Sequence, residues 1–128
     1  MQSTSKTIAL RDALQNLLNS LTENVYYEEA SVSRHYPYIV FELSELGFSD
    51  ERTLIQMEVN AFDYGKSSST VEMISDEIQE ALDQYYFIND YIQFCIYKDS
   101  RQIIKEMDKK IIRRRMLFEI HLHERKGV

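Results

Sequence analysis

The segment 53–62 constrains the fold more than any other part of the sequence. Apolar residues occupy every second position from 55 to 61, and polar residues stand between them. An alternation of period two is typical of a β-strand with one face on a core and the other in water. Because the apolar face of such a strand must be buried, the chain needs a sheet that packs against a second layer.

Three further segments have strand features: 91–97 and 111–124 alternate in the same way, and 38–43 is rich in β-branched and aromatic residues. They predict strands at about 38–43, 91–97 and 111–124, and Pro37 precedes the first of them, where proline is tolerated. Residues 25–27 can start an additional extended segment. The segment 44–52 and the segment 63–68 contain glycine and serine and are expected to be turns. The polar segment 99–110 is expected to hold a turn or a short helix.

Two segments have apolar residues at steps of three and four, which is the pattern of a helix with one apolar side. They predict helices at about 5–21 and 69–85. Ser3, Thr4 and Ser5 can cap the first helix, and Ser69 or Thr70 can cap the second. The predicted fold class is α+β: a two-layer sandwich in which two helices pack on one face of a mainly antiparallel sheet of about four strands. Residues 1–128 are expected to form one domain.

Composition excludes several classes of protein. The chain has 128 residues, one cysteine and no apolar run near the roughly 18 to 20 residues of a membrane span. A disulfide scaffold is therefore excluded, and we expect no membrane contact. The formal net charge of −6 also opposes general affinity for nucleic acid.

Motifs for chemistry are scarce, and we expect no enzymatic activity and no cofactor. The isolated glycines form no phosphate-binding loop. Cys95 lies in an alternating apolar strand, which is typical of a packed residue and not of a nucleophile. His121 and His123 project from one face of a strand and could bind a metal with His35 or Glu119, but their spacing favours a solvated sheet face. The many carboxylates could supply an acid/base pair, which the sequence does not single out.

The positive charge is concentrated near the C-terminus. Residues 101–128 contain 9 basic and 4 acidic side chains, whereas residues 1–100 contain 6 and 17. Such a division favours head-to-tail association of copies, and pairing within one chain is the alternative. The basic cluster at the start of the last strand has three interpretations: contact with an acidic protein face, solvation, or contact with nucleic acid. It consists of Lys109, Lys110, Arg113, Arg114 and Arg115.

Tyrosine is frequent, with nine copies. Its ring is apolar and its hydroxyl is polar, so it suits half-buried positions at protein interfaces as well as the rim of a core. The many tyrosines are therefore compatible with a protein interface and with packing at the rim of the core.

The order of these segments resembles the tail terminator (tail completion) family of long-tailed bacteriophages and prophages. The resemblance is carried by the leucine-rich first helix, the Pro-Tyr strand at 37–42, the segment QMEVNAFD at 56–63 leading through a serine-rich loop into the second helix, and the closing strand after DKKIIRRR at 108–115. It implies a structural, non-enzymatic protein. Such proteins form a ring, commonly a hexamer, that caps the completed tail tube and presents a surface to the head-completion or neck protein.

The resemblance places the chain at the head-proximal end of a virion tail, and in the host cytoplasm during assembly. We expect ring closure to pair the basic segment 109–115 with acidic residues of a neighbouring copy. The segments 44–52 and 63–68, the latter with Asp63, Tyr64 and Lys66, are expected to contact the tail tube and the neck. The alternatives are another head–tail connector protein, a nucleic-acid-binding α+β module that uses the basic segment, and a small metal-dependent hydrolase.

Overall fold

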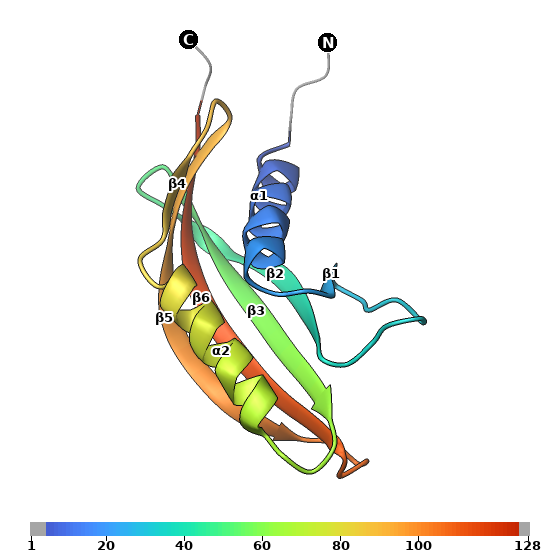
Figure 1. Ribbon diagram of the computed structural model, residues 1–128. Coiled ribbons are helices and arrows are strands. Elements are labelled where there is room, and N and C mark those ends of the chain that lie inside the picture. The colour runs from blue at the N-terminus through green and yellow to red at the C-terminus, as the bar shows by residue number, and fades with distance from the viewer. Residues whose placement is uncertain (1–4, 126–128) are drawn as a thin grey trace.

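The computed structural model describes residues 5–125, and within them it has two helices and six strands. The strands form one sheet in the order β1-β2-β3-β6-β5-β4, and both helices lie on the same face of it (Figure 1). In chain order the elements are α1 (Lys6–Leu21), β1 (Val25–Tyr27), β2 (Tyr38–Ser49), β3 (Arg52–Tyr64), α2 (Ser69–Leu82), β4 (Tyr86–Ile88), β5 (Ile92–Lys105) and β6 (Ile111–Glu124).

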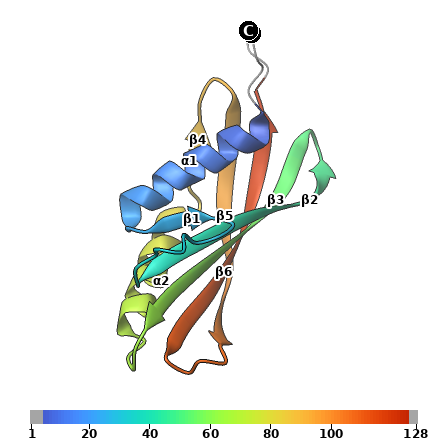
Figure 2. The same ribbon diagram turned by 90° about the vertical axis from the view of Figure 1, so that its right-hand side faces the viewer.

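The predicted α+β class with two helices is confirmed, but the prediction of about four strands is wrong. Two short strands, β1 and β4, add one member to each edge of the sheet. The β1–β2 pair is parallel and the other neighbours are antiparallel, so the sheet is mixed and curled (Figure 2). The segment 25–27, expected to be extended, forms β1, whereas the sequence pattern did not define β4, because a strand of three residues is too short to show an alternation.

The long strands extend further than their apolar alternation. Strand β2 continues to Ser49, so the expected turn at 44–52 shrinks to Asp50 and Glu51, whose φ angles are 53° and 62°. Positive φ at both positions is the geometry of a tight two-residue hairpin turn. Strand β5 continues to Lys105, where a turn or short helix was expected. These extensions are mostly exposed and include the apolar residues Leu46, Phe48 and Ile103, while their backbones still pair with β3 and β6.

The helix ends also differ slightly from the predicted ones. Ser5 is the N-cap of α1 and accepts a hydrogen bond from the Ile8 amide at 3.4 Å, while Ser3 and Thr4 lie outside the described residues. Helix α2 ends at Leu82 and not at 85, and the Tyr85 carbonyl then accepts from the Ile96 amide at 2.9 Å. At the start of α2 the N-cap is Ser68, which makes no side-chain cap bond.

The core lies between the helices and the sheet face that they cover. Three leucines of α1 and three apolar residues of α2 are fully buried against alternate residues of the four long strands. The central layer consists of residues that face one another on β3 and β6, including Met57 opposite Phe118 and Val59 opposite Met116. Each pair of this kind removes two apolar side chains from water, which is the main favourable contribution to folding.

Ser75 of α2 provides a test of this packing. Its side chain is fully buried, and its hydroxyl has no hydrogen-bond partner among residues 5–125. A buried polar group without a partner is costly, and alanine also favours a helix. We expect Ser75→Ala to raise the free energy of unfolding by about 1 kcal/mol, as measured by urea denaturation. A loss of stability would show that the hydroxyl makes a bond that this packing lacks.

Candidate interaction surface

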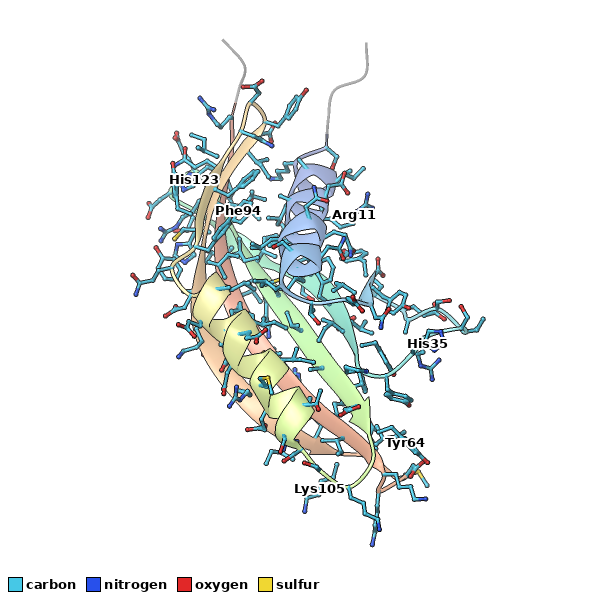
Figure 3. All side chains as sticks on the ribbon, viewed as in Figure 1. Arg11, His35, Tyr64, Phe94, Lys105 and His123 are labelled. Carbon is cyan, nitrogen blue, oxygen red and sulfur yellow. The ribbon has the colours of Figure 1, made fainter. Side chains whose placement is uncertain are left out.

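Most of the predicted interface residues meet at one end of the sheet. The β5–β6 turn and the β3–α2 loop lie side by side there, because the Gly65 amide donates a hydrogen bond to the Lys110 carbonyl at 2.8 Å. Tyr64 pairs with Ile111 at the last position of the β3–β6 register. We call residues 63–68 and 105–111 the distal end, and Figure 3 labels Tyr64 and Lys105 in it.

The distal end combines positive charge with apolar surface. Lys66, Lys109 and Lys110 are exposed, and Asp63 is half-buried. Tyr64 is 47% exposed, and its ring lies 5.5 Å from that of Tyr36. Met107 is fully exposed and Ile103, at the adjoining end of β5, is 65% exposed. Exposed apolar side chains that gather at one end of a protein mark a candidate interaction surface.

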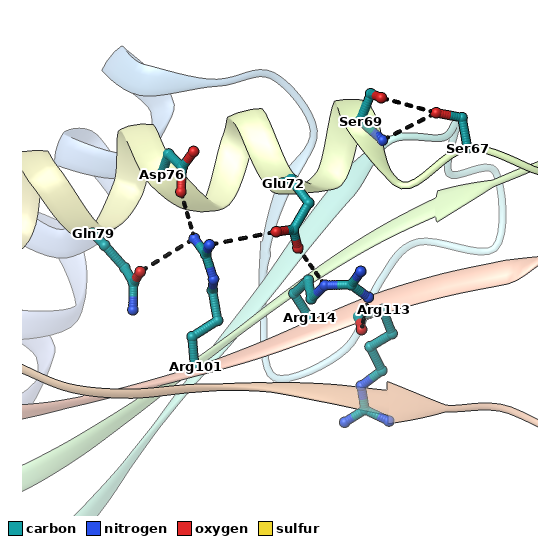
Figure 4. Close-up of polar contacts among 8 residues, drawn as sticks. All are labelled: Ser67, Ser69, Glu72, Asp76, Gln79, Arg101, Arg113 and Arg114. Atoms are coloured by element: carbon teal, nitrogen blue, oxygen red, sulfur yellow. Dashed lines mark hydrogen bonds and ion pairs between the residues drawn. The ribbon is translucent and has the colours of Figure 1, made fainter.

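Arg114 has a different place from the lysines. Its side chain points to the helix side of the sheet, where only about a tenth of it is exposed, and it forms an ion pair with Glu72 of α2. Glu72 also contacts Arg101 of β5 at 3.5 Å, and Arg101 pairs with Asp76 at 2.8 Å (Figure 4). This cluster joins α2 to β5 and β6 at the edge of the core.

Arg113 and Arg115 point to the opposite face, which no helix covers. Arg113 pairs with Glu106 at 2.9 Å and donates to the Asn60 side chain at 2.9 Å. Arg115 pairs with Glu58 at 2.9 Å. The three consecutive arginines are therefore divided between two faces, as strand alternation requires.

These ion pairs change how the basic cluster is interpreted. Each arginine at 113–115 contacts an acidic residue of its own chain, and the partners of Arg114 and Arg115 lie far away in sequence. Reversing the arginine charges would leave the partner carboxylates facing like charge and would damage the fold. The cations of the cluster that contact no carboxylate within the described residues are Lys109 and Lys110.

A shallow hollow lies on the uncovered face, between the β1–β2 loop and the sheet. Its volume is about 510 Å³, and its apolar floor includes Tyr38 and Phe62, whose rings stack with centroids 4.7 Å apart. Burial raises the pKa of the Tyr38 hydroxyl, and nearby Arg34 partly offsets this effect. Five carboxylates line the hollow: Glu28, Glu29, Glu42, Glu58 and Glu106.

The β2–β3 turn lies at the other end of β3 from the distal end. The end of β2 that leads into this turn carries Leu46 and Phe48, which are 55% and 69% exposed, and the turn itself is Asp50 and Glu51. The two segments expected to make contacts, 44–52 and 63–68, therefore lie at opposite ends of the sheet (Figure 2). A small protein with apolar side chains exposed at both ends can contact two partners at once.

The candidate metal ligands do not come together in the described part of the chain. His35 and His123 lie far apart (Figure 3), and His121 contacts Glu119 at 3.1 Å. Among residues 5–125 no group of three His, Cys, Asp or Glu side chains is placed to hold a metal ion. Cys95 is half-buried on the uncovered face. No helix among these residues is long and apolar enough to cross a membrane.

Comparison with solved structures matches this fold to a chain in the virion of a native gene transfer agent (GTA) particle. The match has a TM-score of 0.66 and covers 84% of each chain, at 9% sequence identity. At so low an identity, the likeness shows a shared fold. None of the protein-family models matches the sequence, and none of the curated proteins does.

The ion pair of Glu72 with Arg114 gives a test of the cluster in Figure 4. In Glu72→Gln the poorly exposed Arg114 guanidinium loses its counter-charge, which we expect to cost about 2 kcal/mol in the free energy of unfolding. Glu77→Gln is the matched control, because Glu77 is exposed on the same helix and forms no ion pair among residues 5–125. Equal midpoints of urea denaturation for the two variants would contradict this account.

Proposed function

We propose that the chain is a structural virion protein that caps the completed tail tube of a phage-like particle as a ring and forms the joining surface for the head. The observation that carries this proposal is the fold shared with a chain of the GTA virion over 84% of both proteins. The resemblance of the segment order to tail terminators supports the finer assignment. The proposed role is non-enzymatic and needs no cofactor.

The layout of the exposed apolar residues also supports a role between two partners. Phe48 and Leu46 lie at one end of the sheet, and Met107 lies at the other. In a ring of such chains, one end can contact the last ring of the tail-tube protein and the other can contact the head-completion or neck protein. The proposed ring is a hexamer at the head-proximal end of the tail, assembled in the host cytoplasm.

Another head–tail connector protein of the same assembly is a second candidate. The fold match favours it equally, because the matched chain is identified only as part of the whole GTA particle. A nucleic-acid-binding module has less support. Such a module would need free cations for phosphate contacts, and Arg113, Arg114 and Arg115 already contact carboxylates of their own chain.

Growing tail tubes provide the direct test of capping. We expect the purified protein to bind one end of tubes assembled from the tail-tube protein of the same particle and to stop their elongation, as seen by negative-stain electron microscopy. Tubes that keep growing with the protein unbound would reject the terminator role. Binding only to isolated head portals would favour the connector alternative.

A matched pair of variants tests whether the β2–β3 turn makes an axial contact. Phe48 is 69% exposed at the end of the sheet, and Met73 is 60% exposed on the outer side of α2. We expect Phe48→Ser to weaken binding to tubes or necks at least tenfold, about 1.4 kcal/mol, since an exposed aromatic residue at an interface is a common energetic centre. We expect Met73→Ser to bind as the unmodified chain does. Equal binding by the two variants would remove the turn from the contact.

A further inference from the structure

Strands β2 and β5 each have a long edge segment that pairs with no other strand among the described residues. Strand β1 pairs with β2 only at residues 39–41, which leaves the outer edge of 42–49 open. Strand β4 pairs with β5 only at residues 93–95, and the edge is open again from 99 to 105. Open edges expose rows of backbone donors and acceptors, which can pair with a further strand.

The hydrogen bonds of the preceding residues determine which backbone amides and carbonyls point to these open edges. The Ile39 amide and the Phe41 carbonyl bond outward to the β1 region, so strand alternation directs the groups of Leu43 outward next. On β5 the amide and the carbonyl of Ile96 bond outward. Beyond the bulge between Lys98 and Ser100, the residues in the matching register are 101, 103 and 105, whose outward groups meet no partner within the described chain.

The two edges fit one another in direction. The order β2-β3-β6-β5 alternates in direction at each step, because every pair in it is antiparallel. When the β2 of a second copy is placed beside β5 in the same orientation of the sheet, the new pair is antiparallel as well. An arrangement that continues in this way is a head-to-tail contact, and such contacts produce rings when the rotation closes.

The edges also fit in position. When β5 of one copy pairs antiparallel with β2 of a second copy, the end of the open segment of β5 lies beside the start of the open segment of that β2. Strand β4 then meets the β2–β3 turn of the second copy, and the distal end meets its β1, so the two short strands bound the contact without occupying it (Figure 1). The two open segments span eight and seven residues by their bounds, 42–49 and 99–105.

Charge favours the same arrangement. Beside the open edge of β2 lie exposed carboxylates, including Glu42 and Glu45, and the Glu28 amide bonds to the Phe41 carbonyl. Beside the open edge of β5 lie exposed lysines at 98, 105, 109 and 110, which outnumber the exposed acidic residues at 99 and 108, while the half-buried Glu106 pairs with Arg113. Opposite charge steers the two edges together and disfavours a pair of identical edges.

We infer that the open edge of β2 in one copy of this chain pairs antiparallel with the open edge of β5 in the next, so that successive copies share one continuous sheet. The inference rests on the proposed ring, and it names the surface through which that ring closes. The distal end of one copy then lies beside Glu28, Glu29 and Glu42 of its neighbour. The lysines of the distal end then pair with acidic residues of the neighbouring copy, as expected from the sequence for the whole basic cluster.

Complementary charge reversals test the pairing. One variant is Lys105→Glu/Lys109→Glu, which makes the β5 side acidic, and the other is Glu28→Lys/Glu42→Lys, which makes the β2 side basic. All four residues are exposed and lie outside the ion pairs of the described chain. Each variant alone would bring like charges together at every contact. In an equal mixture the reversed edges match one another and the unmodified edges match as before.

Sedimentation velocity over a concentration series, up to the solubility limit, gives the readout at low salt. We expect the unmodified chain and the mixture to form the same assembly, and each variant alone to associate at least tenfold more weakly. A control, Glu77→Lys/Glu80→Lys, makes the same change of net charge as Glu28→Lys/Glu42→Lys, but on the exposed side of α2, and should assemble normally. Assembly by either variant alone, no rescue in the mixture, or an unmodified chain that stays monomeric would each overturn the inference.

A backbone variant separates strand pairing from charge attraction alone. Ile103→Pro removes an amide that points to the open edge and has no partner in its own chain, whereas Ile103→Thr keeps that amide on a β-branched residue. We expect the proline variant to lose assembly and the threonine variant to keep it, with both folded by circular dichroism. Assembly of the proline variant at the unmodified strength would contradict a shared sheet.

Failure of this inference and failure of the proposed function look different. A chain that caps tail tubes but ignores the charge reversals keeps its function and loses the edge pairing. A chain whose edges pair as described but that never binds tubes or necks keeps the pairing and loses the terminator role.

Discussion

The apolar face of the sheet has to be covered, and two helices cover only part of its length. The buried residues of β3 and β6 extend from Thr53 and Leu122 at one end to Ala61 and Arg114 at the other. Beyond those limits the strands continue as hairpins without a helix above them. The same constraint that creates the core thus creates two projecting ends, and these ends carry the exposed apolar residues that a protein of this proposed role needs.

At the boundary between core and distal end, charge replaces apolar contact. Arg114 occupies a position whose side chain points inward, where the register of Met116 and Phe118 would otherwise place another apolar residue. Glu72 at the start of α2 compensates it, and an acid in the first turn of a helix is also favoured by the helix dipole. Strands β5 and β6 are therefore joined to α2 by ion pairs just before the distal end, which leaves the lysines of the distal end available for contacts.

The open strand edges connect the fold to the proposed assembly. Exposed edges are a hazard for a soluble protein unless they are short, charged or used. Here the hazard is limited by an excess of carboxylates beside the β2 edge and of exposed lysines beside the β5 edge, because identical edges then repel one another and unlike edges attract. A chain built in this way resists random aggregation, and a directional contact with another copy remains possible.

The sequence by itself determined the elements with a strong period. The alternation at 53–62 and at 111–124 and the two helical stripes predicted the class and the layer order, since period decides which side chains share a face. Tertiary structure alone decided the parallel pairing of β1 with β2, the continuation of β2 and β5 beyond their predicted ends, and the partners of Arg114 and Arg115. The physical reason is that the strand pairing and ion pairs of these residues join positions far apart in the chain, such as Glu72 with Arg114, and such partners leave no periodic trace in the sequence.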